Sequence, residues 1–279
     1  MHILNLKKGF APCGPGTLEL SRSRVFSGGE VDLQLLALIP RPTETLITTR
    51  LNSSDDVMEL LMATDALREL GADTLHLFIP YLPYARQDRV VRDGEAFSLR
   101  VFADLINAQG YASVRVFDPH SHVGSALLRR SKVITNHAFV GQVLAGRADY
   151  WLLSPDSGAY SKVSALAKAI GYDGDIALCN KIRVGDGTID AVTVTVTDFD
   201  GKDVFIVDDI CDGGRTFIAL AKEIRTRNAG AINLIVSHAI FSYGEQVLKD
   251  GGIDHVYTTD SFKLIGSPFV TQVKLCIHI

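Results

Sequence analysis

Short runs of β-branched and apolar residues alternate along this chain with stretches of helical periodicity. The predicted strands lie at 45–50, 74–79, 114–117, 150–154, 191–197, 203–207 and 232–236. The helical patterns lie at 55–70, 98–109, 159–170 and 216–228. The clearest of them, 55–70, begins with Ser and Asp capping candidates and stops at Gly71. Strands that alternate with helices predict an α/β fold in which mainly parallel sheets are covered on both faces.

The alternation forms two similar blocks that meet near residue 145. Each block has several strand–helix units and a strand that runs into a polar loop. A chain of 279 residues is long enough for two medium domains. We therefore expect an N-terminal domain over 1–145 and a C-terminal domain over 146–279. Ligands of open α/β sheets gather beyond the carboxyl ends of the strands, so functional residues are expected there.

Composition excludes several classes of protein. The formal net charge of −4 argues against general nucleic-acid binding, which usually needs a basic surface. The four cysteines form no CxxC pair and are expected to be reduced thiols. The N-terminus lacks the apolar segment of a secretory signal, and no run of about 18 apolar residues could span a membrane. A cytoplasmic location is expected.

The segment 203–218, DVFIVDDICDGGRTFI, carries the most chemical information. An apolar strand ends in Asp208 and Asp209, and Asp212 opens a turn that contains Gly213 and Gly214 before a helix begins near Thr216. Backbone N–H groups in such a glycine loop, at the positive end of a helix dipole, suit a phosphate. Carboxylates suit sugar hydroxyls or a phosphate-bound metal. The segment therefore predicts a pocket for a phosphorylated sugar.

Polar groups also follow the predicted strands of the first block. After 74–79 come Arg86, Gln87, Asp88 and Arg89; two guanidinium groups suit a polyphosphate, but a solvated, salt-bridged loop explains them equally well. After 114–117 come Asp118, His120 and His122. Lone histidines near strand ends are usually structural, whereas this grouping also fits a metal or nucleotide contact.

Two further strand ends belong to the second block. Asp156 and Gly158 follow 150–154, where a helix N-cap is an equally good interpretation. Lys181 and Arg183 lie on an extended segment, where charge could simply protect an edge strand. Taken together, three acidic and two cationic strand ends match the needs of magnesium-dependent chemistry on a polyphosphate.

With these residues assembled, the sequence resembles the ribose-phosphate pyrophosphokinases, also called phosphoribosyl pyrophosphate synthetases, from about residue 24 to 262. The matching segments are RVFSGGEVDLQ, DDVMELLMATDALRELGA, IPYLPYARQDR, VFDPHS, SPDSG, KIR and VFIVDDICDGGRTF. The acidic glycine loop occurs throughout the phosphoribosyltransferases, but its combination with PYLPYARQDR is typical of the synthetases. The resemblance implies two tandem phosphoribosyltransferase-like domains. It also implies transfer of the diphosphoryl group of ATP to the 1-hydroxyl of ribose 5-phosphate, with Mg²⁺ as cofactor.

The resemblance also implies roles for individual residues. The positions that match the ribose 5-phosphate loop are Asp208, Asp209, Asp212, Gly213, Gly214, Arg215 and Thr216. Those that match ATP contacts are Arg86, Gln87, His120, Phe26 and Glu30, the last two reaching the adenine of a neighbouring subunit. His120 and Asp156 match positions near magnesium, and the catalytic cations match Lys181, Arg183 and Arg89. A homo-oligomer built from dimers, such as a hexamer, is implied.

The chain departs from the family pattern in four places. Gly28 replaces the acid of FSDGE, and DGGRT replaces DTGGT. The added Arg215 fits either a further donor to the 5-phosphate or a solvent-facing side chain. LALIPRP, at 36–42, replaces a polar segment of the phosphate/ADP regulatory site, and the usual C-terminal helix is lacking. We therefore expect a looser preference for ATP and weak or absent ADP inhibition.

Two alternative functions share some of these features. A phosphoribosyltransferase that acts on a nucleobase has the acidic glycine loop, but it needs one such domain and no RQDR loop. A non-catalytic regulatory paralogue of the synthetase would be expected to lose the cations and acids that this chain retains.

Overall fold

The computed structural model describes residues 1–36, 43–183 and 189–277, excluding the side chains of 21–22, 181–183 and 189–192. The chain forms two compact units. The first contains Met1–Ile134 together with Lys274–Ile279, and the second contains Thr135–Val273. Each unit has a sheet and a hydrophobic core of its own.

The first unit is built on a parallel five-stranded sheet in the order β1-β4-β5-β6-β7. Its strands are β1 (His2–Asn5), β4 (Glu44–Thr48), β5 (Thr74–Ile79), β6 (Ser113–Phe117) and β7 (Ser131–Ile134). Its helices are α1 (Ser54–Glu69), α2 (Ser98–Ala108) and α3 (His122–Leu127). A separate antiparallel hairpin consists of β2 (Glu19–Val25) and β3 (Val31–Leu36).

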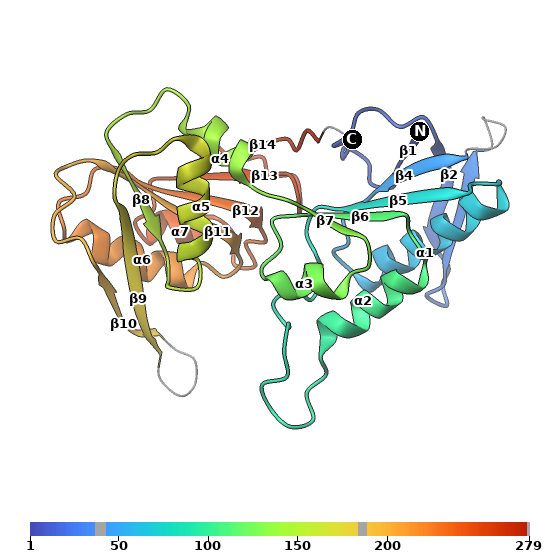
Figure 1. The fold of residues 1–279 in the computed structure, drawn as a ribbon, viewed down its shortest axis with the longest axis horizontal. Helices are drawn as coiled ribbons and strands as arrows, with labels where there is room; N and C mark the ends of the chain where they lie inside the picture. Colours follow the sequence, from blue (N-terminus) through green and yellow to red (C-terminus); the bar gives the residue numbers. More distant parts are fainter. Residues whose placement is uncertain (37–42, 184–188, 278–279) are drawn as a thin grey trace. The chain divides into compact units, whose positions relative to one another are not determined.

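In the described residues of the first unit, the helices cover one face of this sheet (Figure 1). Alternate residues of a strand face opposite sides, so Ile47 packs with the helices while Leu46 packs on the other face. There the core is Phe10, Phe78 and Phe117, with Leu275 and Ile277 packed against it. The N–H of Ile277 donates to the carbonyl of Pro12 at 2.7 Å. Leu275 and Ile277 therefore complete the core of the first unit.

The second unit has a seven-stranded sheet in the order β10-β9-β8-β11-β12-β13-β14, parallel except for the β9–β10 pair. The strands are β8 (Tyr150–Ser154), β9 (Ile176–Arg183), β10 (Ile189–Val194), β11 (Asp203–Cys211), β12 (Ile232–Ala239), β13 (His255–Thr259) and β14 (Val270–Val273). The helices are α4 (His137–Leu144), α5 (Tyr160–Ile170), α6 (Arg215–Arg225) and α7 (Gln246–Asp250).

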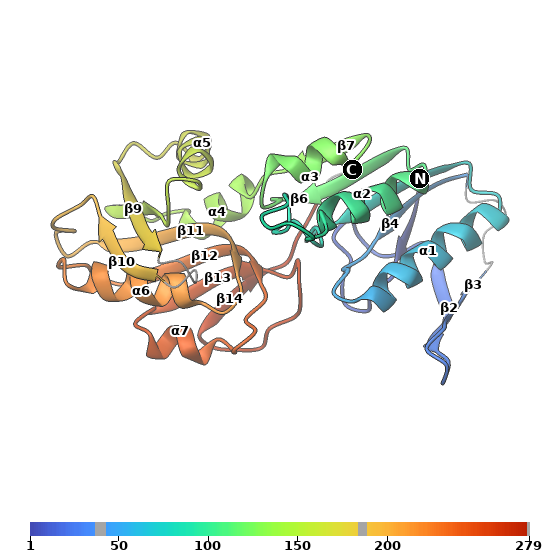
Figure 2. The same cartoon turned by 90° about the horizontal axis from the view of Figure 1, so that it is seen from below.

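Helices cover both faces of the second sheet, with α5 on one side and α6 and α7 on the other (Figure 2). Along β11 the side chains alternate between the two cores. Phe205 and Val207 pack with α4 and α5, whereas Val204 and Ile206 pack with α6. This central strand is therefore fixed from both faces along its first half.

The units divide the chain differently from the expected boundary at 145. The division falls between Ile134 and Thr135, because Phe139 and Val140 of α4 pack into the core of the second unit with Leu166 of α5. The residues after Val273 lie in the first unit rather than the second. In the described residues, no helix is long and apolar enough to cross a membrane.

Candidate functional site

Strand β11 extends four residues beyond the predicted end, so Asp208 and Asp209 lie within it. Its pairing with β8 stops at Ile206, which faces Leu153, whereas its pairing with β12 continues to Cys211. β8 ends at Ser154, and the chain turns away through Pro155 and Asp156. The carboxyl end of β11 thus emerges beside the β8–α5 turn, which brings the predicted acids from two strand ends together.

These acids are close enough to affect one another. Burial raises the pKa of Asp208, and the charges of Asp209 and Asp156 raise it further. The N–H of Asp209 donates to Oδ1 of Asp208 at 2.9 Å. A site that holds several carboxylates at low exposure favours a partner that brings hydroxyl donors or positive charge.

Lys162 of α5 supplies such a charge, and the sequence analysis missed it. Its Nζ lies 3.7 Å from Oδ2 of Asp209, whose side chain is 8% exposed. Lys162 follows Asp156 by six residues, so the β8–α5 turn delivers both a carboxylate and an ammonium group to the end of β11. A cation in the first turn of a helix that follows a strand-end loop is the signal that could have identified it.

The turn after β11 has the predicted form of an anion site. Gly214 is the N-cap of α6, with a left-handed φ of 76°, and no side chain caps the helix. The first hydrogen bond of the helix runs from the N–H of Ile218 to the Gly214 carbonyl at 3.0 Å. The N–H groups before Ile218 have no acceptor within the helix, as at the start of any α-helix. Arg215 is exposed at the first helical position, beside Thr216. These groups suit a phosphate.

Asp156 closes the β8–α5 turn but is not the N-cap of α5, which is Ala159. Oδ1 of Asp156 accepts the N–H of Ala159 at 2.9 Å, and Oγ of Ser154 donates to the Asp156 carbonyl at the same distance. Structural and functional roles are compatible here, because the same Asp156 charge acts on Asp208.

In the first unit, the predicted nucleotide residues follow β5 and β6. Arg86, Gln87 and Arg89 are exposed, whereas Asp88 is buried and accepts from Nε of Arg89 at 2.9 Å. Burial alone would raise the pKa of Asp88, but the neighbouring Arg89, Ser121 and His120 together outweigh burial, so the pKa is lowered. The loop is therefore salt-bridged, as the structural interpretation expected, while its cations remain accessible to an anion.

The residues after β6 are divided between the interior and the surface. Asp118 is buried with φ 38°, and its N–H donates to the Ile134 carbonyl at 2.8 Å. His120 is exposed two residues later. A strained buried aspartate that anchors the loop leaves the histidine accessible. Within the described parts of the chain, no three or more His, Cys, Asp or Glu side chains gather as a metal site.

Phe26 and Glu30 lie in the tight turn of the β2–β3 hairpin. The N–H of Phe26 donates to the Glu30 carbonyl at 2.8 Å. Phe26 is 46% exposed, and the Arg24 guanidinium lies 4.5 Å from the centre of its ring. A Cβ on Gly28 would lie 2.5 Å from Oε2 of Glu30. The glycine at this departure from the family pattern therefore permits the observed position of the Glu30 carboxylate.

Lys181 and Arg183 are described only by their backbone. In the β9–β10 hairpin, Lys181 pairs with Val192 and Arg183 with Ile189. Their side chains, and residues 37–42 of the LALIPRP segment, lie outside the described parts of the chain.

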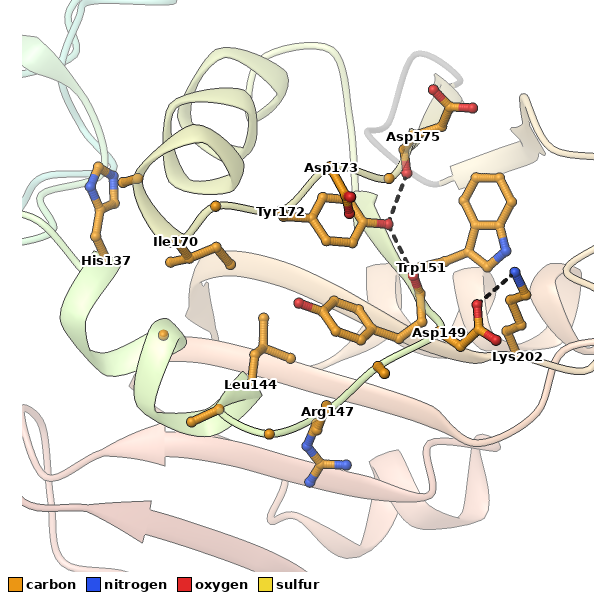
Figure 3. A pocket seen from close by; sticks show the side chains of 18 of the residues that line it. His137, Leu144, Arg147, Asp149, Trp151, Ile170, Tyr172, Asp173, Asp175 and Lys202 are labelled. Carbon is orange, nitrogen blue, oxygen red and sulfur yellow. Dashed lines mark hydrogen bonds and ion pairs between the residues drawn. The ribbon is translucent and has the colours of Figure 1, made fainter.

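The second unit also contains a cavity of about 880 Å³ (Figure 3). It is lined by Arg147, Asp149, Tyr150 and Tyr172, among others. Tyr150 pairs with Asp203 at the first residue of β11, so the cavity lies at the amino ends of the strands. The acids and the glycine loop lie at the opposite ends, and the cavity is not part of the candidate site.

Comparison with known proteins identifies relatives over most of the chain. Residues 17–110 match the family of N-terminal domains of ribose phosphate pyrophosphokinase, and residues 131–269 match the phosphoribosyl transferase domain family. A ribose-phosphate pyrophosphokinase of Vibrio vulnificus is 32% identical over 249 residues, covering 86% of this chain and 77% of that protein.

Further similarities agree with this assignment. Ribose-phosphate pyrophosphokinase 2 of Archaeoglobus fulgidus is 30% identical over 219 residues, covering 78% of this chain and 77% of that protein. The crystal structure of phosphoribosylpyrophosphate synthetase from Mycobacterium smegmatis has a TM-score of 0.80 at 22% identity, over 91% of this chain and 85% of that one. This structural likeness confirms the fold of two phosphoribosyltransferase-like domains.

Proposed function

This chain belongs to the ribose-phosphate pyrophosphokinase family, and we propose that it transfers the diphosphoryl group of ATP to the 1-hydroxyl of ribose 5-phosphate. The products are phosphoribosyl pyrophosphate and AMP. The observation that carries the proposal is the end of β11, where two acids precede a glycine N-cap that leaves the start of α6 without a side-chain cap.

The sugar phosphate occupies this end of β11. Asp208 and Asp209 accept hydrogen bonds from the ribose hydroxyls, which brings donors to a crowded group of carboxylates. The 5-phosphate binds at the start of α6, where backbone N–H groups and the helix dipole favour an anion. The residues proposed for the phosphate are Asp212, Gly213, Gly214, Arg215 and Thr216.

ATP is proposed to bind residues of the first unit. Its phosphates contact Arg86, Gln87 and His120, which the structure places on exposed loop positions. Phe26 and Glu30, on the exposed hairpin turn, contact the adenine of a neighbouring subunit, so a homo-oligomer built from dimers is part of the proposal.

In the reaction, the 1-hydroxyl oxygen of the sugar attacks the β-phosphorus of ATP. The new bond forms as the bond from the β-phosphorus to the oxygen bridging it to the α-phosphate breaks. AMP leaves with that oxygen, and the hydroxyl proton passes to water. Arg89, Lys181 and Arg183 neutralise the negative charge that develops on the phosphate oxygens.

Magnesium is the proposed cofactor. Mg²⁺ prefers oxygen ligands and usually binds through one or two carboxylates together with water and substrate phosphates, which fits the Asp156 carboxylate. His120 is the second residue proposed near magnesium, and its imidazole would contact the metal through one of the water molecules that Mg²⁺ usually keeps. Bound magnesium supplies further neutralisation of the phosphate charge.

The decisive experiment incubates the protein with ribose 5-phosphate, ATP and magnesium and measures AMP and phosphoribosyl pyrophosphate. Equal amounts of the two products are expected. Lys181→Ala should abolish AMP release while ribose 5-phosphate still binds. Release of pyrophosphate from added phosphoribosyl pyrophosphate only when a nucleobase is present, without AMP formation, would instead identify a phosphoribosyltransferase. No turnover of either kind would identify a regulatory paralogue.

Two regulatory and cellular properties complete the proposal. We propose that ADP inhibits weakly or not at all at a separate site, and strong inhibition by ADP at saturating ATP would contradict this. A cytoplasmic location, where both substrates are made, is also proposed.

A further inference from the structure

The two glycines of the phosphate loop are glycines for different reasons. Gly214 has the left-handed φ of its N-cap position, and a Cβ there would lie 2.7 Å from Cδ2 of Leu248. Gly213 is outside the left-handed region, so its backbone alone does not require glycine. A Cβ on Gly213 would instead lie 3.0 Å from Cε2 and 3.2 Å from Cδ2 of Tyr243. Carbon atoms prefer separations of about 3.5–4.0 Å. The edge of the Tyr243 ring therefore lies directly against the bare backbone of Gly213.

The turn that carries Tyr243 is attached to the end of β11. The N–H groups of Ile240 and Phe241 both donate to the Cys211 carbonyl, at 2.9 and 3.2 Å. Gly244 closes the turn by donating its N–H to the Phe241 carbonyl at 3.0 Å. The carbonyl of Ile240 accepts from Nζ of Lys263 at 2.7 Å. These four bonds fix the backbone on both sides of Tyr243.

Phe241 adds strain and an anchor to this turn. Its φ is 49°, a left-handed conformation that is strained for a bulky residue. Its side chain is buried in the core of the second unit. Such strain persists where the surrounding structure over-determines the backbone, and it is concentrated at binding sites. Burial of Phe241 turns the chain so that Tyr243 projects outward.

Tyr243 is held in this way although the residue is 63% exposed. A large aromatic side chain fixed against an anion-binding loop, yet mostly open to solvent, has a free surface where a ligand of the loop would lie. We propose that Tyr243 is a further substrate-binding residue that contacts the bound sugar phosphate. Its ring forms one wall of the phosphate pocket, in the space that a side chain at position 213 would fill. The inference rests on the proposed function, because it takes this loop to be the ribose 5-phosphate site.

The test measures ribose 5-phosphate binding by titration calorimetry without ATP, with KM for ribose 5-phosphate as a second measurement. Tyr243→Ala should weaken binding about tenfold, which corresponds to about 1.4 kcal/mol. Gly213→Ala should also weaken binding, because its Cβ displaces the ring. The loss of affinity caused by Gly213→Ala should persist when it is combined with Tyr243→Phe, which keeps the ring. It should disappear when Gly213→Ala is combined with Tyr243→Ala. Val101→Ala, at a position on α2 with a matched exposure of 62%, is the control for loss of an exposed apolar side chain.

The outcomes separate this inference from the proposed function. Wild-type protein that does not bind ribose 5-phosphate would refute both. Wild-type protein that binds it, with a Tyr243→Ala variant of unchanged affinity, would refute the role of Tyr243 alone. It would also be refuted if Gly213→Ala weakened ribose 5-phosphate binding equally in the Tyr243→Phe and Tyr243→Ala backgrounds. Circular dichroism of each variant establishes that the fold is retained.

Discussion

Replacing Lys162 by Met tests whether this cation positions Asp209 for ribose 5-phosphate. Methionine keeps the unbranched shape and the helix propensity of lysine but removes the charge. At 3.7 Å from Oδ2 of Asp209, a unit charge interacts by about 4 kcal/mol at an effective dielectric of about 20. The Lys162 side chain is 37% exposed, so water screens much of this attraction, and exposed pairs contribute only about 1 kcal/mol or less.

The interaction energy of the Lys162–Asp209 pair is expected between these two values, because the Asp209 side chain is only 8% exposed. We expect a net loss of roughly 1–2 kcal/mol in the binding of ribose 5-phosphate, about a 5- to 30-fold rise in KM. The kcat should fall much less, since the cation acts on the sugar site rather than on the transferred group. Lys162→Arg, which keeps the charge, should restore most of the affinity.

Steady-state kinetics with ribose 5-phosphate varied at saturating ATP provides the measurement. Lys168→Met, an exposed lysine on the same helix, is the matched control and should leave KM unchanged. If Lys162→Met and Asp209→Asn act through one interaction, the double variant should be no worse than the more severe single variant. Unchanged KM in Lys162→Met, or a Lys162→Arg variant as impaired as Lys162→Met, would refute the positioning role.

Three further predictions concern groups near the site and at the ends of the chain. Because the pKa of Asp208 is raised in the folded state, this acid favours folding most at low pH and least once the pH exceeds its folded pKa. Asp208→Asn should therefore raise the thermal unfolding midpoint at pH 7 while it weakens sugar binding. A lowered midpoint would contradict this. Gly214→Ala should destabilise the protein by more than about 1 kcal/mol in urea unfolding, through its φ and the contact with Leu248. Burial raises the pKa of Cys13 to about 11, so iodoacetamide at pH 7.5 should modify exposed Cys276 first, and Cys13 alkylation should accelerate as the pH rises toward 11, as followed by peptide mass spectrometry.

Local patterns in the sequence were sufficient for much of the fold. The helix α1 begins with the predicted cap, since Ser53 and Asp56 form a reciprocal capping box. The alternation of strands and helices gave mainly parallel sheets, because parallel neighbours need crossover connections. The 203–218 segment folds as a strand, a glycine turn and a helix, as its residues predict. Each of these features depends on residues that are neighbours along the chain.

Contacts between distant segments could not be read in the same way. The predicted helical patterns did not include α4, and the expected boundary at 145 placed its residues in the first domain. The structure places α4 in the second unit, because only the packed core shows which sheet a short helix covers. Nor does the composition of the last residues show that Leu275 and Ile277 complete the core around Phe10.

Some residues of the sugar-phosphate site were likewise predictable from local sequence patterns, and others were brought there only by contacts between distant segments. The sequence by itself determined the acids and the glycines at the end of β11, because strand, turn and helix signals are local. Only the tertiary structure placed Lys162 beside Asp209 and the Tyr243 ring against Gly213, since both contacts depend on how β8, β11 and β12 are ordered in the sheet. Neighbouring parallel strands bring their carboxyl ends to one edge, and that edge joins segments that lie far apart in the chain.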